Sequence, residues 1–350
     1  MSPRIRDYGI APGRLPTGPR NRITDVAGVR VGHCTLRQGA INTGVTVILP
    51  GPDNPFANRY TAAAYVHNGF GKTCGLMQVQ ELGSLETPIA LTNTLNVGKV
   101  ADALVAYTLA RCQGEGVAAH TINPVVGECN DSRLNDIAAR PVESAHLLAA
   151  IEAAGEDFAE GGVGAGCGTV CYGLKGGVGS ASRRICLAGR VYTLGALVQS
   201  NFGATADLVL AGQPVGERIL ARLEAGAGSA QDQGSIMTVI ATDLPLSDRQ
   251  LYRVIRRAGV GIARTGAYTG HGSGEVMIGF TTANRLPAAG AELTEMTCLR
   301  EDLLEGPFQA AAEAVHEAIL NSLAAAEPAT ALDGSLCHAL GEFLPGALDG

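Results

Sequence analysis

The sequence predicts a layered α/β sandwich, with helices outside two packed β-sheets. Short apolar runs interrupted by glycine recur along the chain, as expected of strands joined by tight turns. These runs do not alternate one for one with helical segments, which argues against a Rossmann or TIM-barrel arrangement. Hydrophobic residues make up 46% of the chain but aromatic residues only 4%, so the core must consist of Ala, Val, Leu and Ile. No shift in composition marks a boundary, and residues 1–350 are interpreted as one domain.

The first part of the chain predicts an extended arm followed by strands and two helices. Residues 1–20 are expected to form the arm. Valine alternates with small or polar residues in the predicted strands, which span 23–36, 42–51 and 88–94. Asn96 is positioned to cap a helix that runs to about Cys112, because apolar residues recur there at helical spacing. A second helix is predicted to start with Pro141 in its first turn.

Strands separated by helices are also predicted for the remainder of the chain. Strand runs punctuated by glycine cover 163–204, and further strands are predicted at 235–244 and 274–284. Between the last two, Ser247 and Gln250 fit a capping box that opens a helix. A final helix is predicted from about residue 307 to residue 326, where apolar side chains recur at helical spacing.

Composition and charge exclude several classes of function. The net charge of −7 provides no basic face, so no nucleic-acid partner is expected. No apolar run reaches about 18 residues, so no segment is expected to span a membrane. The first residues lack the apolar stretch of a signal peptide, and the nine cysteines have no zinc-site spacing. They are interpreted as reduced thiols of a cytoplasmic protein.

The junction Gly234-Ser235 is the most informative feature of the sequence. Small and polar residues dominate 223–234, and an apolar, β-branched run follows. Cleavage before Ser235 would leave chains 1–234 and 235–350 and give the serine a free α-amine. Such an amine has a pKa of about 8 and can act as the base for its own hydroxyl. We therefore predict a processing loop at 223–234 and a nucleophile at Ser235; the alternative is an ordinary strand start.

Four further residues are candidates for the same site. Ser273 and Glu275 alternate along an extended segment, so their side chains share one face and could polarise a nucleophile or an amine. One helix of about 15 residues between this strand and that of Ser235 suits a parallel connection, so the pair is expected to face Ser235 from the neighbouring strand. Asn201 ends a strand run before glycine, where its amide could donate to an oxyanion. Glu128 follows an apolar run and could pair with a substrate ammonium. Taken singly, each of them is also consistent with an ordinary turn residue or a solvated acid.

Eight ordered segments together resemble the self-processing L-aminopeptidase/D-esterases and β-aminopeptidases related to DmpA and BapA, which form peptidase family S58. The resemblance extends over nearly the whole chain. Its segments are 23–33, 67–72, 88–98, 124–131, 174–183, 197–203, 234–243 and 270–284. A series of this length in this order is not expected by chance.

The resemblance implies both a fold and a site. The fold is a four-layer αββα sandwich similar to N-terminal-nucleophile hydrolases but with different connectivity. Ser235 corresponds to the nucleophile, Ser273 and Glu275 to the residues that assist it, Asn201 to the oxyanion donor, and Glu128 to the acid that receives the substrate amine. The implied substrate is a small peptide, amide or ester with a free amine, from which an L-α, D-α or β-amino acid is released. No metal or organic cofactor is expected, and the implied assembly is a homotetramer of cleaved units.

One departure and two alternatives accompany this resemblance. Cys129 stands where the family pattern has threonine, which puts the substrate preference in doubt. A related branch that cleaves nylon oligomers cuts before threonine, whereas this chain has Ser235 at the junction. The alternatives are a self-processing acyltransferase resembling the ornithine acetyltransferases, which also cut before threonine, and a non-enzymatic binding protein on the same fold. Amide release from aminoacyl-p-nitroanilides would distinguish the three.

Overall fold

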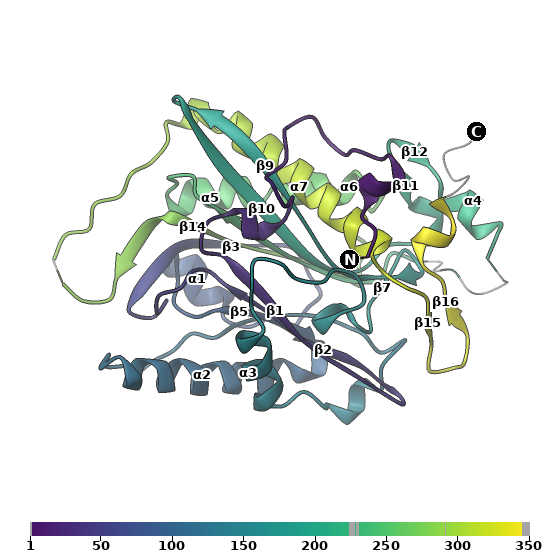
Figure 1. Cartoon of the computed structure of the whole chain (residues 1–350), viewed down its shortest axis with the longest axis horizontal. Coiled ribbons are helices and arrows are strands. Elements are labelled where there is room, and N and C mark those ends of the chain that lie inside the picture. Colours follow the sequence, from purple (N-terminus) through teal and green to yellow (C-terminus); the bar gives the residue numbers. More distant parts are fainter. Residues whose placement is uncertain (1, 224–227, 229–230, 291, 345–350) are drawn as a thin grey trace.

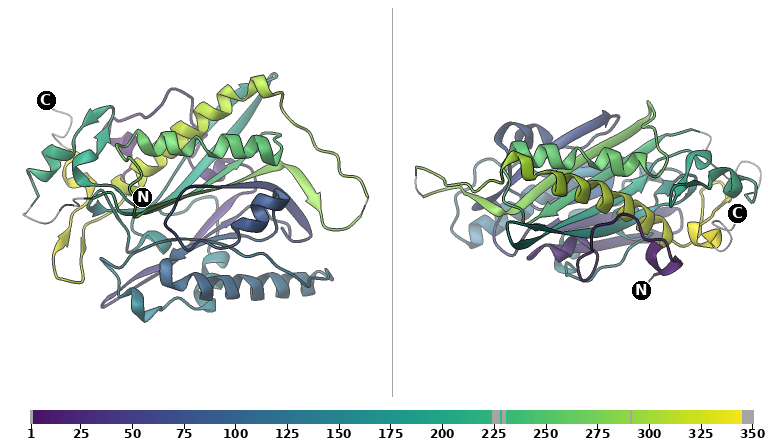
Figure 2. Two further views of the ribbon diagram at one scale, coloured as in Figure 1. Left: turned by 180° about the vertical axis from the view of Figure 1, so that it is seen from behind. Right: turned by 90° about the horizontal axis from the view of Figure 1, so that it is seen from above.

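The computed structural model describes residues 2–223, 228, 231–290 and 292–344, which form four layers (Figure 1). Two β-sheets pack against each other, and helices lie on both outer faces, as the further views in Figure 2 also show. One face is covered by α2 (Val97–Gly114) and α3 (Ser144–Glu152), and the other by α5 (Asp248–Ile255), α6 (Ala258–Ala263) and α7 (Glu305–Ala324). The predicted αββα sandwich is confirmed.

The smaller sheet has four strands in the order β1-β2-β5-β6. They are β1 (Arg30–Gln38), β2 (Ile41–Leu49), β5 (Ile89–Asn93) and β6 (Val125–Cys129). β5 and β6 run parallel, while the other pairs are antiparallel. The strand predicted at 23–36 begins only at Arg30, because Ile23–Asp25 form a 3-10 helix. The carboxyl end of β6 carries Glu128.

The larger sheet has six strands in the order β4-β3-β14-β13-β10-β9. They are β3 (Asn58–Gly69), β4 (Ser84–Leu85), β9 (Gly177–Leu187), β10 (Arg190–Asn201), β13 (Gly234–Thr242) and β14 (Ser273–Pro287). β13 runs parallel to β14 and antiparallel to β10. Strand β3 was not predicted, because its consecutive alanines lack the β-branched pattern of a strand. This sheet therefore brings Asn201, Ser235 and Ser273 to neighbouring strand ends.

Short elements complete the described part of the chain. Two small helices are α1 (Leu76–Leu82) and α4 (Gly216–Leu220). Three two-stranded ribbons are formed by β7 (Val170–Cys171) with β8 (Leu174–Lys175), β11 (Val209–Leu210) with β12 (Gln213–Pro214), and β15 (Ala329–Thr330) with β16 (Leu336–Cys337). Half of the predicted processing loop, at residues 224–227 and 229–230, lies outside the described residues.

The helix ends test the predicted caps. Ser247 Oγ accepts the Gln250 N–H at 3.2 Å, and Gln250 Oε1 accepts the Ser247 N–H at 3.2 Å, so the predicted capping box is confirmed. α2 begins after Asn96 as predicted, but the side chain that receives an N–H there is that of Asn93. The predicted start of the second helix at Pro141 is wrong, because α3 begins only at Ser144.

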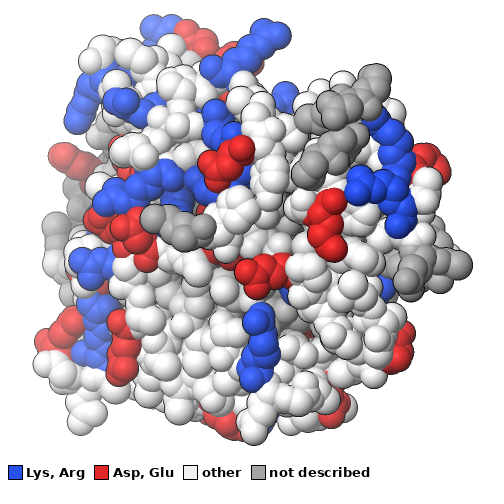
Figure 3. Space-filling view, turned by 45° about the vertical axis from the view of Figure 1, so that its right-hand side comes forward, with Lys and Arg blue, Asp and Glu red and all other residues white. Residues whose placement is uncertain are grey.

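The expected N-terminal arm is not simply extended. It contains a 3-10 helix at Ile5–Tyr8, and Arg6 forms an ion pair with Glu317 of α7 at 2.6 Å. The arm is therefore tied to the outer helix layer. Among the described helices, none combines the length and apolar character needed to cross a membrane. On the face shown in Figure 3, positive and negative side chains are interspersed.

The packing of β13 determines which way each of its residues faces. Met237, Val239 and Ala241 belong to the core between the two sheets, whereas Ile236 and Ile240 pack in the core under α5, α6 and α7. On β14, Val276, Ile278 and Phe280 face the inter-sheet core, and Met277 faces the helices. Since side chains alternate along a strand, odd-numbered residues of β13 and even-numbered residues of β14 point between the sheets.

Candidate active site

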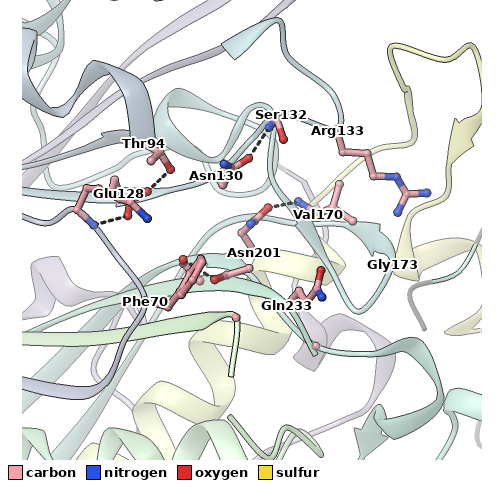
Figure 4. A pocket seen from close by; sticks show the side chains of 15 residues that line it. Phe70, Thr94, Glu128, Asn130, Ser132, Arg133, Val170, Gly173, Asn201 and Gln233 are labelled. Atoms are coloured by element: carbon pink, nitrogen blue, oxygen red, sulfur yellow. Dashed lines mark hydrogen bonds between the residues drawn. The ribbon is translucent and has the colours of Figure 1, made fainter. Parts of the chain in front are cut away.

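A pocket of about 390 Å³ opens where the ends of β6, β10 and β13 meet (Figure 4). Three of the residues predicted from the sequence, Glu128, Asn201 and Ser235, line it together with Gly234. They come from three separate strands and from both sheets. The fold therefore brings these positions into one cavity, although they are spread over more than a hundred residues of sequence.

Ser235 lies at the amino end of β13, directly after the predicted cleavage bond. Its side chain is largely buried, and its hydroxyl donates to the carbonyl oxygen of Gly234 at 2.5 Å. The nucleophile candidate therefore lies beside the carbonyl group of its own preceding residue. A hydroxyl held there is suitably placed to attack that carbonyl carbon.

Gly234 has a backbone that no other residue would tolerate well. Its φ is +126°, in a region that side chains rarely adopt, and a Cβ built there would lie 1.8 Å from the carbonyl oxygen of Asn201. The same hypothetical atom would lie 3.0 Å from Asn201 Nδ2. The close approach of the two backbones at this point therefore depends on glycine.

Asn201 ends β10 in direct register with Ser235. Its Oδ1 accepts the backbone N–H of Val170 at 2.9 Å, which fixes the orientation of the amide. The Nδ2 group is thus directed toward Gly234 and remains available as a donor in the pocket. A donor in this position can stabilise negative charge that develops on a carbonyl oxygen near Ser235.

Glu128 is held at the end of β6 by two hydrogen bonds. Its Oε1 accepts the backbone N–H of Lys72 at 2.8 Å, and its Oε2 accepts the hydroxyl of Thr94 (Figure 4). Glu128 as a whole is 3% exposed yet lines the pocket, so the orientation of its carboxylate is set before any substrate enters. Such a buried, oriented carboxylate provides a receptor for a substrate ammonium group.

Ser273 and Glu275 lie on the neighbouring strand but on the other face of the sheet. β13 and β14 pair in parallel as predicted, and Ser235 is in register with Gly274. Ser273 and Glu275 therefore point toward the helices, whereas the Ser235 side chain points between the sheets. The prediction that they face the Ser235 hydroxyl is wrong on this register, and neither residue lines the pocket. The connection between the two strands also contains two helices, α5 and α6, instead of one.

The two side chains of this second face form their own pair. The Ser273 hydroxyl donates to Glu275 Oε1, as their shared face predicted, and both residues are almost fully buried. Glu275 Oε2 is buried without a hydrogen-bond partner among the described residues. Burial raises the pKa of Glu275 to about 7; the Ser273 hydrogen bond opposes this rise, and the charge of Asp232 adds to it. An unsatisfied carboxylate oxygen at this position has room for one more donor.

Several residues of the site were not singled out from the sequence. Lys72 and Thr94, which hold Glu128, fall within segments 67–72 and 88–98 of the family resemblance, but their residue types alone indicated no role. Arg133, which lines the pocket, lies outside those segments. Asp232 is a buried acid two residues before the junction, and nothing in the local pattern distinguishes it from a solvated linker residue. Such contacts depend on how distant loops meet, which local spacing does not encode.

Cys129, the departure from the family pattern, does not line the pocket. It is fully buried, and its Sγ donates to the carbonyl oxygens of Gln199 and Ser235, each at 3.4 Å. Burial raises the pKa of the Cys129 thiol, which keeps it protonated and able to donate. The residue therefore contacts the strand of Ser235 and not the wall that a substrate would touch.

Comparisons with known proteins agree with this arrangement over the whole chain. Residues 21–337 match peptidase family S58. The β-peptidyl aminopeptidase BapA of Sphingosinicella microcystinivorans is 38% identical, and the match covers 95% of this chain and 88% of that protein.

Solved structures extend the likeness to the fold. A Burkholderia sp. β-aminopeptidase superposes with a TM-score of 0.92 at 43% identity, covering 99% of this chain and 98% of that one. The L-aminopeptidase D-Ala-esterase/amidase of Ochrobactrum anthropi superposes with a TM-score of 0.91 at 36% identity and the same coverage. That protein is described as a prototype of the serine aminopeptidases and a variant of the Ntn hydrolase fold. The chain belongs to peptidase family S58 and is an aminopeptidase with an Ntn-hydrolase fold.

Proposed function

We propose that this chain cleaves its own Gly234-Ser235 bond and then uses Ser235 as the N-terminal nucleophile of the aminopeptidase. The observation that carries the proposal is the 2.5 Å contact between Ser235 Oγ and the Gly234 carbonyl oxygen, in a pocket shared with Asn201 and Glu128. The substrates are small peptides, amides or esters with a free amine. No sequence feature at the site calls for a metal or organic cofactor.

Self-cleavage proceeds through an ester. Ser235 Oγ attacks the carbonyl carbon of Gly234, the bond from that carbon to the Ser235 nitrogen breaks, and the hydroxyl proton is passed to the nitrogen. Water then hydrolyses the ester, which releases the Gly234 carboxylate and restores the Ser235 hydroxyl. The products are residues 1–234 and residues 235–350, the latter with a free α-amine.

The amine released by cleavage lies between the two faces of the sheet and can interact with groups on both. The nitrogen of Ser235 belongs to the backbone of β13, in the plane of the sheet, whereas Ser273 and Glu275 lie behind it on the helix face. Glu275 Oε2, which has no hydrogen-bond partner in the described part of the chain, is an acceptor for a released ammonium group. We propose that Ser273 and Glu275 orient the amine and take up protons from that side, while the hydroxyl stays in the pocket.

Hydrolysis of a substrate reuses the same groups. The substrate ammonium binds Glu128, which sets its first carbonyl carbon beside Ser235 Oγ. The α-amine of Ser235 accepts the hydroxyl proton, and Ser235 attacks the carbonyl. Asn201 Nδ2 stabilises the oxyanion, the leaving amine departs, and water releases the amino acid from the acyl-enzyme.

The assembly and the amino acid preference also belong to this proposal. The family resemblance supports a homotetramer of cleaved units and a cytoplasmic location. The Sphingosinicella and Burkholderia relatives are β-aminopeptidases by name, and the Ochrobactrum relative acts on L- and D-amino acid substrates by name. We therefore propose an N-terminal L-α, D-α or β-amino acid as the released group. Size-exclusion chromatography with light scattering tests the tetramer.

A substrate panel tests the activity itself. p-Nitroanilides of L-α-, D-α- and β-amino acids should be hydrolysed, and their N-acetylated forms should be poor substrates, because they lack the ammonium that Glu128 receives. Efficient turnover of the N-acetylated forms would contradict this role of Glu128. The acyltransferase alternative is not favoured by the comparisons, and acyl transfer to an added amine without net hydrolysis would be required to revive it.

A further inference from the structure

Asp232 occupies a junction of the three strand ends that carry Asn201, Ser235 and Ser273. The residue is 3% exposed. Oδ1 accepts the backbone N–H of Gly203 at 2.9 Å, and Oδ2 accepts the backbone N–H of Gly270 at 3.2 Å. Gly203 lies two residues beyond Asn201, and Gly270 lies three residues before Ser273. A single carboxylate therefore links the segment before the cleavage bond to the ends of two other strands.

The backbone around Asp232 is closely packed against the same loop. A Cβ built on Gly270 would lie 2.2 Å from the carbonyl oxygen of Asp232, so glycine is needed for this approach. The next residues, Gln233 and Gly234, line the pocket, and the Gly234 N–H donates to the carbonyl oxygen of Gly272 at 3.3 Å. The segment from Asp232 to the cleavage bond is thus held along loop 270–272.

We propose that Asp232 is a positioning residue for self-cleavage, which holds the Gly234-Ser235 bond at the ends of β10 and β14 through its two backbone hydrogen bonds. This inference rests on the self-cleavage proposed above. Attack on a peptide carbonyl requires the hydroxyl and the carbonyl carbon to stay in near-attack geometry, which a free linker would rarely sample. The contacts of Asp232 remove that freedom within two residues of the bond.

The contacts of Asp232 require a carboxylate. Both of its oxygens accept an N–H, whereas an asparagine in the same place would direct its NH₂ group at one of the two donors. Asp232→Asn therefore loses one hydrogen bond and introduces a donor facing a donor, while it keeps the shape of the side chain. The resulting shift of the Gly234 carbonyl should slow self-cleavage by about tenfold or more.

Asp243 supplies a matched control at the opposite end of the same strands. It follows β13, and its Oδ1 accepts the backbone N–H of Thr193 in β10 at 2.7 Å. Asp243→Asn also removes a carboxylate that accepts a backbone N–H at a strand end, but it leaves the contacts of Asp232 and the Gly234-Ser235 bond untouched. Its rate of self-cleavage should equal that of the wild type.

The experiment follows freshly synthesised chains. Wild type, Asp232→Asn and Asp243→Asn are made by cell-free translation, and the fraction of intact chain is measured over time on denaturing gels. The melting temperature of each substitution is measured in the Ser235→Ala background, where the proposed nucleophile is absent. Slower cleavage in Asp232→Asn, beyond what its change in melting temperature explains by comparison with Asp243→Asn, is the expected result.

Other outcomes would overturn the inference in distinguishable ways. Cleavage of Asp232→Asn at the wild-type rate would show that the contacts do not position the bond, and the proposed function would stand. Slowing of both variants in proportion to their lost stability would show a merely structural role. A wild-type chain that never cleaves would overturn both the inference and the proposed self-processing.

Discussion

The two faces of the β13–β14 pair differ in what they offer to chemistry. On the pocket face, Ser235, Asn201 and Glu128 are all lining residues of one cavity, and each has a hydrogen bond that fixes its direction. On the helix face, Ser273 and Glu275 do not line the pocket, and Glu275 Oε2 has no hydrogen-bond partner among the described residues. The polar groups of the pocket face are therefore already oriented toward a substrate, whereas the helix face holds a carboxylate oxygen that can still accept a hydrogen bond.

The difference shows what cleavage would add. Before cleavage the nitrogen of Ser235 is a peptide nitrogen of β13, in the plane of the sheet between the two faces. After cleavage it becomes an amine with hydrogen-bond capacity of its own, within a strand that borders both faces. The geometry therefore supports two separate roles. The pocket face binds the substrate and carries the nucleophile, and the helix face takes up protons from the amine.

Removal of the nucleophile should have the largest effect. Ser235→Ala deletes the attacking oxygen of the pocket face, so it should leave the chain full-length and lower kcat by about 10⁵–10⁶-fold. The lost hydroxyl contributes only about 1 kcal/mol to stability, so the fold should persist. Gel analysis and p-nitroanilide hydrolysis give the two readouts. Continued cleavage at the same bond would mean that the nucleophile has been misassigned.

Removal of the charge on the helix face should have the next largest effect. Burial raises the pKa of Glu275 to about 7, so the group gains its charge as the pH rises from 6 to 8. If the ionised form takes up a proton from the Ser235 amine, kcat of the cleaved wild-type enzyme should rise over this interval and level off above it. Glu275→Gln should abolish that dependence and lower kcat about 10²–10⁴-fold with little change in KM. A pH profile shared by the variant and the wild type would contradict this role.

Loss of the oxyanion donor should be somewhat less severe. Asn201→Ala removes Nδ2 from the pocket face and should lower kcat by about 10²–10³-fold. Asn201→Asp keeps the acceptor for the Val170 N–H but also lacks the donor. Both variants should therefore be impaired, and steady-state kinetics on one p-nitroanilide suffices. If Asn201→Asp alone retained full activity, the role of Asn201 would be structural.

Weakening of the ammonium receptor should have the smallest effect of the four. Glu128→Gln keeps the shape of the side chain but loses the charge, so kcat/KM for free-amine substrates should fall about 10–100-fold, mainly through KM. Glu86→Gln is a suitable control, because Glu86 is a buried acid bonded to Arg59 and the Asn123 backbone and does not line the pocket. Equal losses in the two variants would argue against substrate capture by Glu128.

The sequence predicted the strands of the site better than it predicted the directions of their side chains. Gly234, Ser235 and the parallel pairing of their strand with the strand predicted at 274–284 followed from the apolar runs and the helical segment between them. Alternation within one strand also predicted that Ser273 and Glu275 share a face. It could not predict the register between strands, and a shift of one residue moves every side chain to the other face. The expectation that the pair faces the Ser235 hydroxyl failed for that reason.

Contacts between distant loops set the remaining limits. The carboxylate of Asp232 has its two hydrogen bonds only because the loops after β10 and before β14 both contact it. Thr94 likewise reaches Glu128 because β5 and β6 pair in parallel. By contrast, the capping box at Ser247 is a local hydrogen-bond pattern, and there the sequence was sufficient.

The most direct test of the central claim is the identity of the polypeptides in purified wild-type protein. Intact mass measurement combined with N-terminal sequencing should find two chains, residues 1–234 and residues 235–350, the second beginning Ser-Ile-Met-Thr. The Ser235→Ala variant should give one full-length chain. A wild-type protein that hydrolyses aminoacyl-p-nitroanilides as a single uncleaved chain would contradict the account, because Ser235 would then have no α-amine to place between the two faces.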